Sequence, residues 1–325
     1  MAERYYVGFD MGGTKMLAAV LDQKLNTVKT GKIRTPIGAG NKATLAAIAD
    51  LISSTISDAG IEKEQISAVG VAVPGPIDFE KGLVIDLPNA GMEDYKLRDK
   101  LEDELGLPVI IENDVNAGIY GEYVRGAAQG KKNVIGVFPG TGVGGGIIIE
   151  GQLYRGKHGR AGEIGHMIVA AGGPLCGCGK YGCLEAVASK TAIAKDLVHL
   201  AMNGEAPTVL ESAGTDIAKI KSSVIKKSID AGENATLRSL ERAAWYLGVG
   251  LGSCVDIFDP DLIVVGGGLV EKFGNIYLKP IEESMRRHAM SSNDTPIVAA
   301  ELEDDAVFIG VASLASEALG AQDES

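Results

Sequence analysis

Two similar segments, each a strand, a glycine-rich turn and a second strand, place the strongest constraint on how this chain folds. The first turn is Asp10-Met-Gly12-Gly13-Thr14-Lys15, and the second is Gly140-Thr-Gly-Val-Gly-Gly-Gly146. A turn that is followed by a strand forms a hairpin. Two such hairpins about 130 residues apart indicate a weak internal duplication.

The rest of the chain alternates between short buried strands and amphipathic helices. Apolar residues at helical spacing predict helices over 43–56, 97–105 and 235–257, and apolar runs predict strands over 66–73, 109–111 and 261–265. Strands and helices that alternate in two similar halves predict an α/β protein with a cleft between two domains.

We expect a small α/β domain over residues 1–115, completed by a C-terminal helix at about 306–320. The larger α/β domain covers 116–305, and its polar stretch at 203–236 is expected to be a helical insertion on the surface. A chain of 325 residues with 46% hydrophobic content is long enough for two such cores.

Composition also limits the partners and the compartment. The net charge of −12 disfavours binding to nucleic acid. No apolar run reaches the ~18 residues of a membrane span, and the N-terminus lacks the pattern of a signal peptide. We therefore expect a cytoplasmic protein, and the cysteine usage suits that reducing compartment.

Three of the four cysteines lie within eight residues, at Cys176, Cys178 and Cys183, and His166 precedes them. Three thiolates and one imidazole form a complete tetrahedral set for zinc, which leaves no position for a catalytic water. A structural zinc is therefore predicted, the alternative being reduced, buried cysteines. Glu163 and Glu185 flank the cluster and indicate a polar pocket.

The glycine turns and a glycine triplet are candidates for phosphate and nucleoside binding. Exposed backbone N–H groups in such turns suit phosphate oxygens, and Asp10 at a strand end is a candidate ligand for Mg²⁺ or its water shell. An ordinary hairpin turn is the alternative. Gly266-Gly267-Gly268 stands between a strand and a predicted helix, where a plain tight turn is an equally good explanation.

Glu112-Asn113-Asp114 follows the strand at 109–111. In α/β proteins, ligand contacts gather at the carboxyl ends of strands, and an aspartate there can accept a proton from a substrate hydroxyl. The alternative is that Asp114 or Asn113 simply caps the next helix. Together the three side chains offer the hydrogen-bonding groups with which a sugar is gripped.

Taken in order, these motifs resemble the ROK family of sugar kinases and repressors, in particular its glucokinases, from about Val7 to Gly320. The most specific element is Gly162-Glu-Ile-Gly-His166 followed by Cys-x-Cys-Gly-x₂-Gly-Cys-Leu-Glu185. The first hairpin is shared with the wider superfamily of actin-like ATPases.

The resemblance implies two ribonuclease-H-like domains of the actin-like ATPase type around a cleft, a structural zinc and a homodimer. It implies ATP-dependent phosphorylation of a hexose 6-hydroxyl, glucose first, with Mg²⁺ and with Asp114 as general base. The implied sugar contacts are Gly75, Asn89, Glu112, Asn113, Asp114, Glu163, His166 and Glu185. The implied nucleotide contacts are Asp10, Gly12, Gly13, Thr14, Lys15, Thr141, Gly142, Gly267 and Gly268. The implied zinc ligands are His166, Cys176, Cys178 and Cys183.

Three alternatives stay open. The segment after Asn89 lacks the tryptophan that is usual in ROK glucokinases, so N-acetylglucosamine, N-acetylmannosamine, fructose or mannose is an alternative substrate. Polyphosphate is an alternative donor. A sugar-sensing ROK regulator is less expected, because ROK repressors carry an N-terminal DNA-binding domain and the first hairpin here begins at Tyr5.

Overall fold

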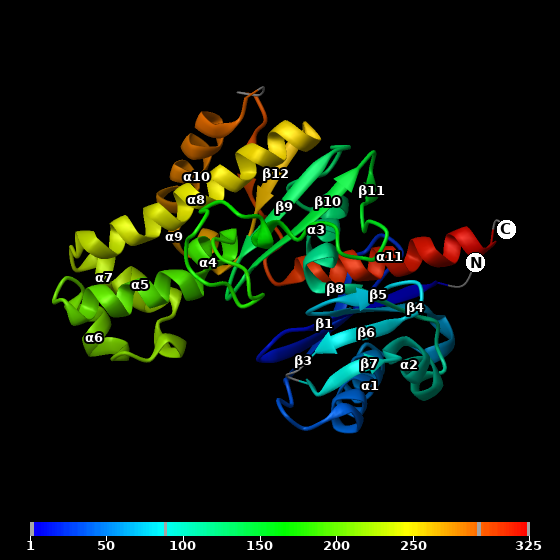
Figure 1. Cartoon of the computed structure of the whole chain (residues 1–325). Coiled ribbons are helices and arrows are strands. Elements are labelled where there is room, and N and C mark those ends of the chain that lie inside the picture. The colour runs from blue at the N-terminus through cyan, green and yellow to red at the C-terminus, as the bar shows by residue number, and fades with distance from the viewer. Residues whose placement is uncertain (1–2, 88–89, 291–293, 324–325) are drawn as a thin grey trace. The chain divides into compact units, whose positions relative to one another are not determined.

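A computed structural model describes residues 3–87, 90–290 and 294–323. The chain forms two compact units. The first unit comprises Met1–Gly130, Arg155–Ala161 and Leu302–Ser325, and the second comprises Lys131–Tyr154 and Gly162–Glu301. Each unit contains one five-stranded sheet (Figure 1). The short segment Arg155–Ala161 is therefore part of the first unit, although the chain on both sides of it belongs to the second.

The sheet of the first unit has the strand order β3-β2-β1-β4-β8. Strands β1, β2 and β3 form an antiparallel meander, and β4 and β8 extend it in parallel to β1. Their bounds are β1 Tyr5–Met11, β2 Lys15–Leu21, β3 Thr27–Arg34, β4 Ile66–Val73 and β8 Val109–Asn113.

The sheet of the second unit repeats this arrangement with the order β11-β10-β9-β12-β13. Strand β9 pairs antiparallel with β10 and parallel with β12, as β1 does with β2 and β4. The bounds are β9 Val134–Pro139, β10 Val143–Ile149, β11 Gln152–Leu153, β12 Leu262–Val265 and β13 Ile297–Ala299. The equal strand orders confirm the predicted α/β fold and its internal duplication.

Helices cover both faces of the first sheet. On β2, Met16 and Val20 pack into the same apolar core as Ile48 of α1, whereas Leu21 packs against Phe308 of α11. This alternation follows from the two-residue period of a strand. The helices of this unit are α1 Asn41–Asp58, α2 Leu97–Leu105, α3 Asp114–Arg125 and α11 Asp305–Asp323.

The second unit is richer in helices, and its longest helix, α8, lies beside α10 (Figure 1). Its longer helices are α5 Lys190–Met202, α6 Pro207–Ala213, α7 Ser222–Asp230, α8 Asn234–Phe258 and α10 Asn275–His288, and its short ones are α4 Leu184–Ala188 and α9 Gly268–Phe273. No helix in the described ranges is both long and apolar enough to cross a membrane.

Two expectations need correction. The turn predicted at 140–146 is shorter, because Gly144, Gly145 and Gly146 lie inside β10. The missing side chain of Gly145 lets the segment that begins at Gly162 pack against this strand.

The stretch 203–236 is helical as predicted but does not lie only at the surface. Its apolar residues Val209 and Ile225 are buried in the main core of the second unit, which supplies the reason for its helices to dock.

The sequence also left several elements unassigned. A separate three-stranded sheet consists of β5 Ile77–Asp78, β6 Leu83–Leu87 and β7 Met92–Tyr95. These strands are too short to show a period. Strand β3 was missed because nearly all of it is exposed, so its sequence does not alternate between apolar and polar residues.

Helices α3 and α11 approach each other closely at small residues. A Cβ on Gly310 would lie 1.9 Å from the carbonyl oxygen of Ala117, and one on Gly121 would lie 2.0 Å from that of Ala306. Such distances require the backbones to move apart, because real Cβ atoms do not approach oxygen so closely.

We expect Gly310→Ala to lower the free energy of unfolding by about 1–3 kcal/mol, because the added methyl group overpacks the contact between α3 and α11. Urea denaturation measures the change. The control is Gly140→Ala, whose added methyl group meets no heavy atom of the described residues within 4 Å. Equal stabilities of the two variants would show that the close contact does not constrain the helices.

Candidate functional site

The candidate residues of the first unit gather at one edge of its sheet. Strands β1, β4 and β8 are parallel, so their carboxyl ends lie at the same edge. Asp10 pairs in register with Ala72, and Ala72 pairs with Glu112. The pairing therefore places Asp10 and Glu112 in one row, two strands apart, with Asp114 following at the end of β8.

Asn113 is the N-cap of α3, and this answers the question that the sequence left open. Its Oδ1 accepts hydrogen bonds from the backbone N–H groups of Val115 and Asn116, at 2.9 and 3.1 Å. Its Nδ2 donates to the carbonyl oxygen of Gly75, at 3.2 Å. The structure thus brings together two predicted sugar contacts, and Asp114 is the first residue of the helix, not its cap.

Asp114 and Asp10 are both half-buried carboxylic acids with perturbed acidity. Burial raises the pKa of Asp114 to about 6, against the opposing hydrogen bond from the Val115 N–H. Burial, and next the negative charge of Asp114, raise the pKa of Asp10 to about 7. A base whose pKa lies near neutral pH, such as Asp114, is suited to proton transfer. A buried carboxylate whose pKa is raised further by a second carboxylate, as that of Asp10 is by Asp114, favours a bound cation.

The first glycine turn, residues 12–14, is fixed by hydrogen bonds from Thr35 and is otherwise largely exposed. Thr35 Oγ1 donates to the carbonyl oxygen of Gly12 at 2.6 Å, and the Thr35 N–H donates to that of Thr14 at 3.2 Å. Gly13 and Thr14 are exposed. Lys15 forms an ion pair with Asp304, which precedes α11. The turn therefore presents exposed backbone at the end of the hairpin, and its one cation is paired with Asp304.

In the second unit, Glu185 connects the second glycine turn to the cysteine cluster. Its Oε2 accepts a hydrogen bond from the Val143 N–H at 3.1 Å, and its Oε1 lies 3.5 Å from the Cys176 sulfur. A Cβ on Gly142 would lie 2.3 Å from the same Oε2. Thr141 is tied to the start of α5, because Thr191 Oγ1 donates to its carbonyl oxygen at 2.6 Å.

Gly267 and Gly268 lie at the same edge of the second sheet as this turn. Strands β9 and β12 are parallel, and a Cβ on Gly267 would lie 3.2 Å from the carbonyl oxygen of Pro139, where β9 ends. Gly267 has a φ of +87°, which only glycine adopts readily. The two predicted nucleotide segments of this unit therefore adjoin each other.

The four predicted zinc ligands come together. The ligand atoms of His166, Cys176, Cys178 and Cys183 all lie within 4.8 Å of one another. The sulfurs of Cys178 and Cys183 are 3.6 Å apart, close to the separation of about 3.8 Å that a tetrahedron with zinc–sulfur bonds of about 2.3 Å requires. The donor set and its spacing thus fit a closed structural zinc site.

His166 points its two ring nitrogens in different directions. Its Nδ1 lies 3.8 Å from the Cys176 sulfur, whereas its Nε2 lies 3.9 Å from Oε2 of Glu163. A metal at the cysteines would use Nδ1 and leave Nε2 beside Glu163. Glu163, His166 and Glu185 are thereby held around one cluster.

One predicted residue lies outside the described residues, and two contributors were not predicted. Asn89 falls between the described ranges 3–87 and 90–290. Asp304 and Arg155 were missed because neither belongs to a motif: they reach Lys15 and Glu112 only through the fold. No local sequence signal could have identified them.

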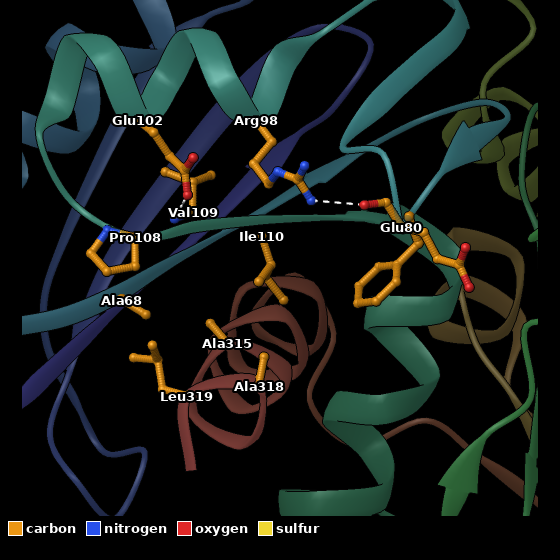
Figure 2. A pocket seen from close by; sticks show the side chains of 11 residues that line it. Ala68, Glu80, Arg98, Glu102, Pro108, Val109, Ile110, Ala315, Ala318 and Leu319 are labelled. Carbon is orange, nitrogen blue, oxygen red and sulfur yellow. Dashed lines mark hydrogen bonds between the residues drawn. The ribbon is translucent and has the colours of Figure 1, made fainter. Parts of the chain in front are cut away.

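A cavity of about 410 Å³ lies at the opposite edge of the first sheet (Figure 2). It is bounded by Ala68 and Val109 near the amino ends of β4 and β8, by Leu319 of α11 and by Arg98 of α2, which donates a hydrogen bond to the Glu80 carbonyl. Its place at the amino ends of the strands separates it from the residues described above.

Comparison with known proteins decides the family. The sequence matches the ROK family over residues 6–318. The chain belongs to the ROK family. Among ROK proteins, a glucokinase from Streptomyces coelicolor is 37% identical over 316 residues, which cover 96% of this chain and 97% of the relative.

Solved ROK structures agree in fold. A ROK family glucokinase from Streptomyces griseus, in complex with glucose and AMPPNP, has a TM-score of 0.82 at 34% identity and covers 96% of this chain and 99% of that one. A ROK hexokinase from Thermus thermophilus has a TM-score of 0.84 at 32% identity and covers 98% and 99% of the two chains. The similarity in fold therefore extends over 96–98% of this chain.

We expect this ROK protein to contain about one zinc ion per chain by elemental analysis, because its four ligand atoms fit the tetrahedral site. Cys178→Ser should lower the zinc content and the melting temperature together, whereas Cys254→Ala, outside the cluster, should leave the zinc content unchanged. Freshly purified wild-type protein that contains no zinc would contradict the assignment. So would a zinc-containing protein whose melting temperature stays the same after a chelator has removed the zinc.

The raised pKa of Asp114 predicts a stability change with a definite sign. The wild-type protein loses stability as the pH rises through about 6, because the ionised carboxylate is disfavoured in the fold. Asp114→Asn removes this loss and should be more stable by roughly 1–3 kcal/mol at about pH 8, with the difference shrinking toward pH 4. Urea denaturation across this range measures it, and a difference independent of pH would refute the assigned cause.

Proposed function

We propose that this ROK protein is an ATP-dependent sugar kinase that phosphorylates the 6-hydroxyl of glucose. The observation that carries the proposal is Asp114, a half-buried aspartate at the carboxyl end of β8 whose pKa is raised to about 6. A carboxylate of that acidity is ionised at neutral pH and still basic enough to take a proton from a hydroxyl group. The glucokinases among its relatives support glucose as the substrate.

Asp114 acts in this proposal as the general base for the attacking oxygen. Phosphoryl transfer depends mainly on in-line positioning and on neutralisation of charge, so the base also orients the nucleophile. The N-cap of α3 supports this role, because Asn113 holds the first turn of the helix through two backbone N–H groups.

We assign the remaining sugar contacts to two groups of residues. In the first unit these are Gly75 and Asn113, joined by a hydrogen bond, with Asn89 as a further contact from outside the described residues. In the second unit they are Glu163, His166 and Glu185, held around the cysteine cluster. Carboxylates and an imidazole nitrogen can accept and donate hydrogen bonds to vicinal hydroxyls.

Nucleotide binding is assigned to the two hairpin turns and to the turn before α9. Gly12, Gly13, Thr14 and Lys15 of the first unit present backbone N–H groups and one cation to phosphate oxygens. Thr141, Gly142, Gly267 and Gly268 of the second unit are the contacts for the rest of the nucleotide. Asp10 would hold Mg²⁺, directly or through water, and a cation would stabilise the anionic form of this half-buried acid, whose pKa is raised to about 7. When bound, Mg²⁺ neutralises charge on the transferring phosphate.

Zinc has a structural role in this proposal. It would join His166 to the three cysteines and so fix the imidazole that faces Glu163. The free thiols suit the reducing cytoplasm, where we place the reaction. We further propose a homodimer, which sedimentation of the purified protein tests directly.

Replacing the base tests the mechanism. Asp114→Ala should fold, as circular dichroism would show, and should lower kcat by at least about a hundredfold, because no other group replaces the base. In the wild-type protein kcat/KM should fall tenfold per pH unit below about pH 6, where Asp114 becomes protonated. Near wild-type turnover in the variant, with ADP released from glucose, would exclude Asp114 as the base.

A panel of sugars and donors tests the substrate. ADP release is measured with glucose, mannose, fructose, N-acetylglucosamine and N-acetylmannosamine, and kcat/KM is compared because discrimination is expressed there. Glucose should give the highest value, with ATP preferred to polyphosphate. A higher value for an N-acetylhexosamine would move the assignment to that sugar, and sugar binding without turnover of any hexose would favour a non-catalytic regulator.

A further inference from the structure

Glu112 differs from the other predicted sugar contacts because its carboxylate is already fully engaged inside the first unit. The side chain is 1% exposed. Its Oε1 accepts hydrogen bonds from the Asn113 N–H at 2.9 Å and from Nδ2 of Asn116 at 3.1 Å. Its Oε2 accepts one from Nε of Arg155 at 2.6 Å. These partners include the residue before Asp114 and a residue in the first turn after it.

Arg155 reaches this carboxylate from a separate segment of the chain. It begins the segment Arg155–Ala161, which belongs to the first unit although residues 131–154 and 162–301 form the second. The segment closes on itself, because the Ala161 N–H donates to the Arg155 carbonyl oxygen at 3.1 Å. The guanidinium of Arg155 also lies over the ring of Phe79, 4.2 Å from its centre.

The two contacts of Arg155 restrict its guanidinium in direction as well as in position. A charge-assisted hydrogen bond of 2.6 Å sets its distance from Glu112, and the ring of Phe79 sets the plane against which it stacks. Lysine could replace the charge but not the planar stacking.

Stability alone gives a weak reason for such a pair. A buried ion pair recovers little more than the cost of removing both charges from water, and an apolar pair of similar volume often does as well. What an apolar pair could not do is accept the hydrogen bonds from Asn113 and Asn116. The carboxylate is therefore needed at this point for orientation, and Arg155 is needed to hold it in place.

We propose that Glu112 and Arg155 are positioning residues that hold Asp114 in the orientation required for proton transfer. This inference rests on the proposed function, because it concerns the geometry of the proposed base. Glu112 fixes the residues on either side of Asp114, and Arg155 fixes Glu112.

Single substitutions separate positioning from sugar contact. Glu112→Gln keeps the shape of the side chain and removes its charge, and Arg155→Met keeps an unbranched apolar chain and removes the guanidinium group. Each should lower kcat by about ten- to a hundredfold, with KM for glucose changed by less than about threefold. Arg155→Lys should recover part of the lost kcat. Arg160→Met, in the same segment and exposed, is the matched control and should behave as the wild-type protein.

The double variant Glu112→Gln/Arg155→Met tests whether the two residues act as a pair. Removing Arg155 alone leaves a buried charge, so Arg155→Met is the variant most at risk of not folding. The double variant avoids this unpaired charge. Its kcat should be no lower than that of the worse single variant, because two members of one network do not contribute additively.

Hydrogen exchange supplies a measurement that does not depend on turnover. The amide groups of Val115 and Asn116 should lose protection in Arg155→Met and in the double variant, and should keep it in Arg160→Met. If the wild-type protein phosphorylates no hexose, the proposed function fails while this measurement still decides whether the pair orders the start of α3.

Two results would overturn the inference. Folded Glu112→Gln and Arg155→Met variants with kcat within about twofold of the wild-type value, and unchanged exchange at α3, would show that the pair positions nothing. A raised KM for glucose at unchanged kcat in Glu112→Gln alone would instead make Glu112 a sugar contact.

Discussion

Parallel pairing of β1, β4 and β8 is the constraint on which the chemistry of the first unit depends. Parallel strands end at a common edge, so residues from three distant parts of the chain, Asp10, Gly75 and Asp114, are brought to one place. The second sheet repeats the arrangement and brings the end of β9 next to Gly267. The duplication thus explains why each unit has one hairpin turn and one further group of candidate residues at the carboxyl ends of its strands.

The acids at this edge illustrate how function opposes stability. Asp10 and Asp114 are half-buried, and burial raises the pKa of both because the ionised forms lose hydration. Their neighbours differ in this respect: Asn113, not Asp114, caps α3, and Glu112 is paired with Arg155. The carboxylate of Glu112, which orients its neighbours, is therefore neutralised by Arg155. The carboxylate of Asp114, the proposed base, has no cationic partner among the described residues.

Several parts of the fold and of the site could be predicted because their signals are local. The limits of β4 and α2 follow from apolar spacing and from Gly106 at the end of α2, and the start of α3 follows from its polar cap. The cluster of His166 and three cysteines could be predicted because the three cysteines are close in sequence. The strands β5, β6 and β7 could not, since a short strand shows its period only when its partner strands are known.

The sequence by itself determined the family, the α/β class and the duplication, and it indicated the candidate metal ligands and the candidate base, because each of these is carried by residue types at fixed local spacings. Only the tertiary structure decided that Asn113 is the cap, that His166 turns Nδ1 toward the cysteines and Nε2 toward Glu163, and that Glu112 is paired with Arg155. Side-chain orientations and contacts between residues distant in sequence are set only when strand pairing and close packing have placed the side chains.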